Sequence, residues 1–360
     1  PLPMTATPET VIREDIRAIS AYPVQHAQGM IKLDAMENPY RLPQWLREAL
    51  AQDLANAELN RYPDPTAPAL RARLRDVMKI PSDAEILLGN GSDELISIII
   101  TACAAPGAVV MAASPAFVMY KMSAIIAKAH FVPVSLAADF SLDADRMVQA
   151  MREHRPAVVF LSFPNNPTGN LFEDEAVARV IREAPGLVVV DEAYQTFASR
   201  SFMSRLPEFP NLIVMRTLSK SGLAGLRLGY AAARPEWMRE LDKVRPPYNV
   251  GVLTQVVGER ILRHPEVLEE QARSIMAERS RLFRALDAMP GVHPFPSEAN
   301  FVLARVADAA GVFEGLRSRG VLIRSLHGAH PLLEQCVRFT VGTPEENDAA
   351  LAALREALAA

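Results

Sequence analysis

The sequence predicts an α/β protein with a mostly parallel seven-stranded sheet between helices, followed by a smaller α+β domain. Two observations support this fold class. From about residue 85 to 233, short apolar runs alternate with helix-patterned stretches, which is typical of a parallel sheet covered on both faces. After Arg245-Pro246-Pro247, a long helical pattern is followed by shorter alternating elements. The chain has 360 residues, 49% of them hydrophobic, which is enough for one large or two medium cores.

Seven strands are expected in the first region, and several are β-branched without polar alternation, as strands buried on both faces should be. They are EILLG (85–89), VVMAAS (109–114), FVPVSL (131–136), VVFLSF (158–163), LVVVDEA (187–193), LIVMRT (212–217) and LGYAAA (228–233). After the first strand, Leu95, Ile98, Ile99 and Ala102 recur at i, i+3, i+4 and i+7. This spacing predicts a helix over 92–104 that packs on the sheet.

The C-terminal region predicts the smaller domain. Residues 250–288 carry helical periodicity that is interrupted at His264-Pro265. The elements expected after them are NFVLARV (300–306), a helix near 308–319, VLIRSL (321–326), VRFTVG (337–342) and a closing helix from 345. Residues 1–41 are rich in proline and turn formers, and we expect an arm that returns to the small domain. The expected division is therefore an arm at 1–41, a large domain at 42–248 and a small domain at 249–360.

Composition and charge exclude several classes of function. The formal charge is −4, with 38 basic and 42 acidic side chains and no block of one sign, so nothing favours nucleic acid or an acidic membrane as partner. The two cysteines, Cys103 and Cys336, lie far apart, which indicates a reducing, cytoplasmic setting without a disulfide. We expect no secretory signal in Pro1-Leu2-Pro3-Met4, no membrane span and, at HGAH (327–330), an ordinary loop and not a metal site.

The chemically unusual residues follow the expected strands, where functional side chains of an open parallel sheet gather. GNGSDE (89–94) opens a helix, and its glycines and the free N–H groups at Ser92 and Asp93 suit a phosphate, although such a motif alone is often only a capped turn. PNNPTG (164–169) is a rigid turn that presents amide side chains, or simply a structural turn.

Asp191 ends a strand that should be buried on both faces, so its carboxylate needs a partner. It either caps a neighbouring helix or pairs with a protonated ring nitrogen, which keeps that ring an electron sink. In the second interpretation, Tyr194 donates to a phenolate oxygen of the same ring.

Lys220 lies in the run TLSKSGLAGLR (217–227), among small and hydroxyl side chains. A lone lysine after a strand is usually a solvated surface residue. A lysine in a desolvated pocket, by contrast, has a lowered pKa and becomes a nucleophile toward an aldehyde. Thr217, Ser219 and Arg227 are the donors that a phosphate beside this aldehyde would need.

Taken in order, these motifs resemble the fold-type I, aspartate-aminotransferase-like family of enzymes that use pyridoxal 5′-phosphate. NNPTG, DEAY and SK…GLAGLRLGY carry the broad likeness. The narrower likeness is to histidinol-phosphate aminotransferases, and it rests on KLDAMENPY (32–40), RYPDP (61–65), GNGSDE (89–94), SPAFVMY (114–120), PYNV (247–250) and RFTVGTPEEN (338–347). The likeness runs from about residue 20 to 350 and implies a fold-type I homodimer with shared active sites.

The resemblance implies a role for each matching residue. Lys220 holds the cofactor as a Schiff base and later moves the substrate proton, and Asp191 faces the pyridine nitrogen. Asn166 and Tyr194 hold the ring oxygen, and Phe117 stacks on the ring. The implied cofactor set is completed by Ser92, Asp93, Thr217, Ser219 and Arg227 at the phosphate, with Tyr62 reaching it from the neighbouring subunit.

For the substrate, the resemblance implies that Arg338 and Arg324 bind anionic groups, with Tyr22, Asn38 and Asn166 in the same pocket. Both arginines could instead be ordinary surface strand residues. Two positions depart from the family pattern. Arg227 lies seven positions after Lys220, where the family more often has eight, and Arg41 follows ENPY, where the family commonly has glycine. An arginine with φ > 0 would be strained there; otherwise Arg41 adds positive charge near the site.

The implied reaction is transamination between L-histidinol phosphate and 2-oxoglutarate, giving imidazole-acetol phosphate and glutamate in histidine biosynthesis. One alternative is an aromatic amino acid aminotransferase, since Phe117, Tyr120 and Tyr22 would serve any flat side chain. Another is a lyase that decarboxylates a compound such as threonine phosphate. A third class, a nucleotide-binding or regulatory protein, has little support beyond GNGSDE (89–94).

Overall fold

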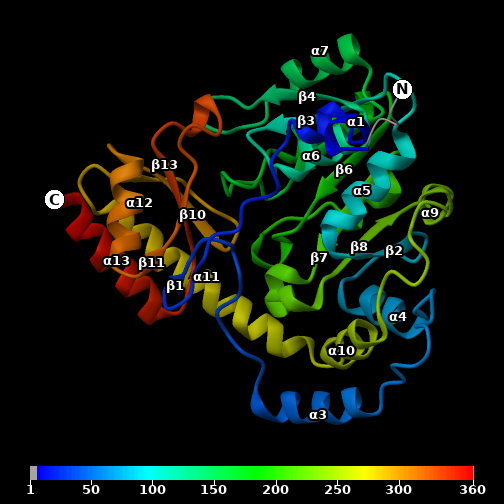
Figure 1. Cartoon of the computed structure of the whole chain (residues 1–360), viewed down its shortest axis with the longest axis horizontal. Helices are drawn as coiled ribbons and strands as arrows, with labels where there is room; N and C mark the ends of the chain where they lie inside the picture. Colours follow the sequence, from blue (N-terminus) through cyan, green and yellow to red (C-terminus); the bar gives the residue numbers. More distant parts are fainter. Residues whose placement is uncertain (1–5, 360) are drawn as a thin grey trace.

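The computed structural model describes residues 6–359 and contains the expected seven-stranded sheet (Figure 1). Its strands are β2 (Glu85–Asn90), β3 (Val109–Ser114), β4 (His130–Ser135), β5 (Val158–Ser162), β6 (Leu187–Asp191), β7 (Leu212–Thr217) and β8 (Leu228–Ala233). They lie in the order β2-β8-β7-β6-β5-β3-β4. Only β8 runs antiparallel to its neighbours, β2 and β7, so the prediction of a mostly parallel sheet is confirmed.

The central strands lack polar alternation because each face of the sheet packs against its own layer of apolar side chains. On β6, Val188 and Val190 join one cluster, whereas Leu187 and Val189 join another. All four side chains are almost completely buried. Burial of each such side chain contributes roughly 1.5–3 kcal/mol, so every position along the strand favours this placement.

Helices cover both faces of this sheet. One face packs against α5 (Gly91–Cys103), α6 (Met119–Ile126) and α9 (Pro235–Asp242). The other packs against α3 (Gln44–Ala55), α4 (Pro68–Val77), α7 (Ala144–His154), α8 (Asp174–Glu183) and α10 (Val252–Leu262). The helix expected over 92–104 is α5, which begins one residue earlier because Gly91 supplies its left-handed start at φ +79°.

A second, four-stranded antiparallel sheet lies beside the first, in the order β12-β13-β10-β9. Its strands are β9 (His293–Pro294), β10 (Phe301–Arg305), β12 (Arg324–Ser325) and β13 (Cys336–Thr340). Its core is shared with α11 (Pro265–Asp287), α12 (Ala309–Ser318) and α13 (Pro344–Ala359). The helical stretch expected over 250–288 is interrupted at the predicted place, because Pro265 starts α11.

The single strand expected over 321–326 is wrong. The segment forms β11 (Val321–Leu322) and β12, which separate at Ile323 because they pair with different partners. β11 pairs in parallel with β1 (Ile31–Lys32) of the arm, and β12 pairs with β13. Strand ends elsewhere differ from expectation by one or two residues, the usual uncertainty of such boundaries.

The arm connects the two sheets. It starts with α1 (Pro8–Val11) and α2 (Glu14–Arg17), and Arg13 donates to the carbonyl oxygens of Ile125 and Ile126 at the end of α6. It then crosses to β11, with which β1 forms a separate two-stranded sheet, as Figure 1 shows. The contact of the arm with α6 was not predicted. Pro1-Leu2-Pro3-Met4, where no secretory signal is expected, lies outside the described residues.

Helix α10 bears on where the small domain begins. It starts after the boundary expected at 248, and yet it packs against α3 and α4 beside the large sheet. We therefore propose that the small domain begins at α11. Within residues 6–359, no helix is both long and apolar enough to cross a membrane.

Candidate active site

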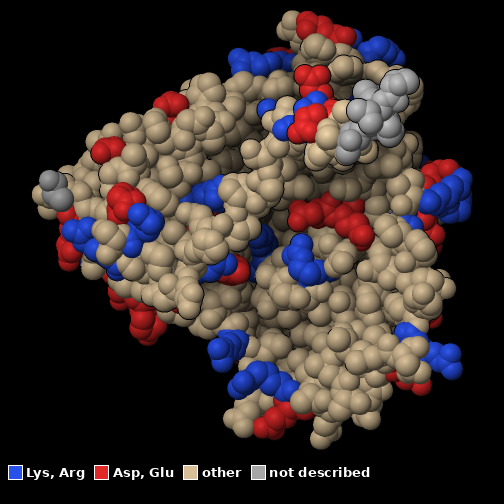
Figure 2. All heavy atoms as spheres, viewed as in Figure 1, with Lys and Arg blue, Asp and Glu red and all other residues tan. Residues whose placement is uncertain are grey.

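A cavity of about 410 Å³ lies where the arm, the carboxyl ends of the large sheet and the smaller sheet meet. Figure 2 shows a hollow near the centre of the face that it draws, bordered by positively and negatively charged side chains. The predicted site residues that line the cavity are Tyr22, Ser92, Asp93, Phe117, Asn166, Asp191, Tyr194, Thr217, Ser219, Lys220, Arg227, Arg324 and Arg338. The fold therefore collects, in one place, residues as far apart in the chain as Tyr22 and Arg338.

Lys220 lies directly after β7 in a tight turn, η3 (Ser219–Leu223), in which Gly222 has φ +120°. Its Nζ donates to the carbonyl oxygen of Ala35 at 3.2 Å and lies 5.7 Å from the centre of the Tyr194 ring. Desolvation lowers the pKa of Lys220 to about 8, and the positive charge of Arg338 acts in the same direction. The amine is therefore far easier to deprotonate than an ordinary lysine.

Asp191 ends β6 at the floor of the cavity, and its two oxygens have different partners. Oδ2 accepts from the Tyr120 hydroxyl at 2.5 Å, and Oδ1 accepts from the backbone N–H of Ala193 at 3.1 Å. Burial raises the pKa of this carboxyl to about 6, although the bond from Tyr120 opposes the shift. Asp191 does not cap a helix; it is held at a strand end with its carboxyl group at the cavity.

Tyr120 corrects one expectation from the sequence. It is fully buried, stacked on Phe160 with ring centres 4.6 Å apart, and it does not line the cavity. It therefore cannot receive a flat substrate side chain, as the aromatic alternative supposed. Its bond to Asp191 could not be predicted from the sequence, because the two residues lie 71 positions apart and on different elements.

One end of the cavity is rich in hydrogen-bond donors. Arg227 Nη1 donates to Ser219 Oγ at 3.2 Å, and Thr217 Oγ1 lies 3.0 Å from the same oxygen. Arg227 Nη2 is 3.5 Å from a carboxylate oxygen of Asp93, in the first turn of α5. These groups, with the helix N-terminus at Ser92, match the needs of a phosphate.

Glycine permits this arrangement. A Cβ on Gly91 would lie 2.6 Å from Arg227 Nη2, so a larger residue there would displace the guanidinium group from its present position. Arg227, seven positions after Lys220, reaches the cavity because the chain passes through the π-turn η3, with Gly222 at φ +120°, and Arg227 itself takes a left-handed conformation at φ +54°. The departure in loop length noted in the sequence therefore leaves Arg227 in the cavity.

The opposite end holds two arginines from neighbouring strands. Arg324 on β12 and Arg338 on β13 are directly paired across the sheet. Arg338 Nη1 donates to Asn166 Oδ1 at 2.7 Å and Nη2 donates to the carbonyl oxygen of Asp34 at 3.1 Å, while Nε has no partner among the described residues. Since like charges repel across a strand pair, this placement favours an anion between the two guanidinium groups.

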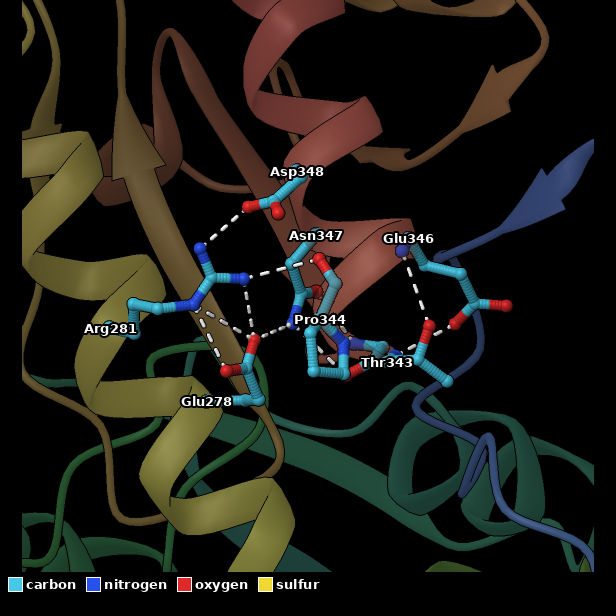
Figure 3. Close-up of polar contacts among 8 residues, drawn as sticks. Glu278, Arg281, Thr343, Pro344, Glu346, Asn347 and Asp348 are labelled. Carbon is cyan, nitrogen blue, oxygen red and sulfur yellow. Dashed lines mark hydrogen bonds and ion pairs between the residues drawn. The ribbon is translucent and has the colours of Figure 1, made fainter.

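The junction that follows Arg338 is braced by a buried polar network, drawn in Figure 3. Asn347 exchanges two hydrogen bonds with the backbone of Gly342 and donates to Glu278 of α11 at 2.9 Å. Arg281 bonds both Glu278 and Asp348. The GTPEEN part of the motif thus fixes the start of α13 against α11, directly after the strand that carries Arg338.

Three predicted or noted residues lie away from the cavity. The Asn38 amide donates to Ser221 O and Gln271 Oε1, so it supports the turn around Lys220 from outside. Tyr62 is 80% exposed and stacks on Tyr248 with ring centres 4.5 Å apart. Arg41 has no positive φ and does not line the cavity, so it is neither strained nor part of the site.

Sequence reasoning missed several lining residues, among them Gln25, Asp34, Ala35, Met36 and Ser162. Ser162 could have been found, because it ends β5 just before PNNPTG. The residues 34–36 lie in the KLDAMENPY motif, but only the pairing of β1 with β11 brings that segment over the cavity.

Comparison with known proteins agrees with this geometry. Residues 28–354 match the family described as aminotransferase class I and II. The chain is 57% identical over 342 residues to histidinol-phosphate aminotransferase 1 of Ralstonia nicotianae, with 94% of this chain and 91% of that protein covered. It is 54% identical over 352 residues to histidinol-phosphate aminotransferase of Chromobacterium violaceum, covering 98% and 99%.

A crystal structure with a similar fold is that of histidinol-phosphate aminotransferase from Sinorhizobium meliloti in complex with pyridoxal-5′-phosphate. The TM-score is 0.86 at 25% identity, and 99% of each chain is covered. The likeness therefore extends over both sheets and is not confined to the motifs.

Proposed function

The chain belongs to the aminotransferase class I and II family, and we propose that it catalyses transamination between L-histidinol phosphate and 2-oxoglutarate. The products are imidazole-acetol phosphate and glutamate, and the reaction belongs to histidine biosynthesis. The single observation that carries the proposal is the cavity itself. It holds Lys220, with a pKa of about 8, between a donor-rich end at Arg227 and the paired Arg324 and Arg338.

The cofactor is pyridoxal 5′-phosphate, and the residues present fit it. When bound, it supplies an aldehyde that takes up amino groups and a ring that withdraws electrons from the substrate α-carbon. Arg227, Ser219 and the α5 N-terminus at Ser92 would hold its phosphate. Asp191, fixed by two hydrogen bonds at the cavity floor, would keep the ring nitrogen protonated.

The remaining side chains orient the ring and move the proton. Asn166 and Tyr194 would donate to the ring oxygen, and Phe117 would cover one face of the ring. Lys220 would hold the cofactor and then, as base and acid, carry the proton from the substrate α-carbon. Its lowered pKa suits this work near neutral pH, because an amine that is always charged cannot accept a proton.

The substrate end must accept two anions of different shape, the phosphate of L-histidinol phosphate and the carboxylates of glutamate. Each guanidinium offers several donors in a fixed fork. Arg338 is rigidly held by Asn166 and by the segment at Asp34, whereas Arg324 on the edge strand β12 has more freedom. We propose that Arg338 binds a carboxylate of glutamate and that Arg324 binds the phosphate of L-histidinol phosphate.

We further propose a cytoplasmic homodimer with shared active sites. The support for shared sites is Tyr62. Its aromatic side chain is exposed and stacks on Tyr248. The cytoplasmic placement is supported by the free thiols Cys103 and Cys336, which suit a reducing compartment.

A screen of half-reactions tests the proposal. The protein purified with its cofactor is mixed in turn with L-histidinol phosphate, glutamate, L-phenylalanine and threonine phosphate, and the cofactor absorbance is followed. We expect a rapid spectral change with the first two, and no release of CO₂ from threonine phosphate. Lys220→Ala should abolish turnover and the yellow absorbance. Faster reaction with L-phenylalanine than with L-histidinol phosphate, or CO₂ release, would contradict the assignment.

A further inference from the structure

Asp34 presents a buried carboxylate to the substrate end of the cavity. The residue is 8% exposed and lines the cavity beside Arg338. Its Oδ2 accepts from the Gln25 amide at 3.1 Å, but its Oδ1 has no hydrogen-bond partner among the described residues. Arg338 contacts residue 34 only through the backbone carbonyl. A buried carboxylate oxygen without a donor is unfavourable, so its retention calls for an explanation.

The surrounding contacts hold this carboxylate in place. Leu33 bonds through its backbone N–H to Leu322 and through its carbonyl oxygen to Thr340, on opposite sides. The Gln25 amide that holds Asp34 also donates to the carbonyl oxygen of Ile323. The Asp34 side chain is thus anchored by the smaller sheet and the arm together. Asp34 is a hydrogen-bond acceptor in a fixed position, and not a mobile carboxylate on the surface.

The other carboxylates of the cavity already have partners. Asp93 lies against Arg227, and Asp191 accepts from Tyr120 and Ala193. Among the carboxylates that line the cavity, Asp34 is therefore the one with a buried oxygen that has no partner among the described residues. It stands next to two arginines that suit an anion, so this end of the cavity is matched to a molecule that carries both an anionic group and a hydrogen-bond donor.

We propose that Asp34 accepts a hydrogen bond from a ring N–H of the substrate's imidazole and so selects the nitrogen heterocycle. This inference rests on the proposed function, and it deepens it by naming the group that recognises the side chain. Glutamate offers no donor at the corresponding position, and its side-chain carboxylate would be repelled by Asp34. Asp34 therefore favours the substrate of one half-reaction over the substrate of the other.

Single-turnover kinetics on the two half-reactions test the assignment. We expect Asp34→Ala to lower the specificity constant for L-histidinol phosphate by roughly 10–100-fold, the range for a hydrogen bond to a charged group. The constant for glutamate should stay within about threefold or rise. Asp34→Asn keeps a neutral acceptor and should lose less. Glu314→Gln removes the same charge from an exposed site that is paired with Arg317 and does not line the cavity, and it should change neither constant.

A second measurement compares two substrates, first in the wild-type enzyme and then in Asp34→Ala. L-phenylalaninol phosphate carries the same amine and phosphate but a ring without N–H groups. We expect the wild type to prefer L-histidinol phosphate by roughly 10–100-fold and Asp34→Ala to lose that preference. No preference in the wild type, or equal losses in both half-reactions of Asp34→Ala, would overturn the assignment. A wild type that takes no amino group from L-histidinol phosphate would overturn the proposed function itself, and the assignment with it.

Discussion

At the scale of single residues, the site depends on side chains whose ionisation is set by burial. Lys220 and Asp191 are shifted in opposite senses by the same cause, because desolvation disfavours the charged form of each. A neutral amine becomes accessible near pH 8, and the acid ionises only above about pH 6. The two groups therefore both reach their working form in the mildly alkaline range.

The pH dependence of cofactor uptake follows from these shifts. Lys220 has a pKa of about 8 in the folded protein, below its ordinary value, so the reactive neutral amine increases as pH rises through 8. We expect the rate at which the cofactor-free enzyme takes up pyridoxal 5′-phosphate to rise between pH 7 and 9 and then to level off. Stopped-flow absorbance measures it. A rate that still rises steeply above pH 10 would show an unshifted lysine.

The lowered pKa of Lys220 also makes the free energy of unfolding depend on pH. The unfolded chain holds a proton on this lysine up to its ordinary pKa, so unfolding binds protons between about pH 8 and that value. The contribution of Lys220 to the free energy of unfolding should therefore rise with pH across this window. Lys220→Met should remove that rise, whereas substitution of the exposed Lys243 should leave it in place.

Tyr120 is expected to position Asp191. Tyr120→Phe removes only the hydroxyl that donates to Asp191, and we expect the affinity for pyridoxal 5′-phosphate to fall about tenfold, because the carboxylate loses a buried hydrogen bond. Equilibrium binding to the cofactor-free protein measures this. Tyr230→Phe is the matched control, since it removes a buried hydroxyl on the other face of the sheet. Equal losses in both variants would contradict a specific role for Tyr120.

At the scale of elements, the sequence was most informative where one periodicity runs without interruption. The seven strands were predictable because their apolar runs are short and several are β-branched, and α5 was predictable because its apolar residues recur at i, i+3 and i+4. The segment 321–326 was not, because its division into β11 and β12 depends on partners from distant parts of the chain. Lys220, Asp191 and Arg227 could be found from their place at strand ends.

Asp34 and Tyr120 could not be found in that way. Their importance comes from a missing hydrogen bond in one case and from a single buried contact in the other. Neither leaves a local pattern, since both depend on which segments lie side by side after folding. The sequence thus predicts the elements and the reactive centre, and the structure adds the groups that orient them.

The junction before α13 is expected to matter more than its surface charges suggest. Asn347→Ala should lower the free energy of unfolding by about 2–4 kcal/mol, because it leaves the buried N–H and C=O groups of Gly342 without their side-chain partner and removes one hydrogen bond to Glu278. Asp348→Ala removes an exposed ion pair to Arg281 in the same network and should cost less than about 1 kcal/mol. Urea unfolding measures both. Similar losses for the two variants would contradict the assignment of the network's stability to Asn347.

At the scale of the whole molecule, the arm and the exposed aromatic pair of Tyr62 and Tyr248 bear on the proposed homodimer. The arm joins both sheets and carries exposed apolar side chains at Val11, Ile12 and Val24. Tyr62, stacked on Tyr248, lies outside its own cavity. If Tyr62 serves the phosphate end of the neighbouring subunit, each active site needs residues from two chains.

Complementation between variants tests this arrangement. Lys220→Ala and Tyr62→Phe each damage a site, but a mixed dimer would contain one site with Lys220 from one chain and Tyr62 from the other. With random pairing, the mixture should recover about a quarter of the wild-type activity, since half of the dimers are mixed and each has one intact site of two. Lys220→Ala paired with Asp191→Ala is the matched control, because both residues line the same chain's cavity and no mixed dimer regains an intact site. Activity in the first mixture no greater than the sum of its separate variants would show that Tyr62 acts within its own chain or not at all.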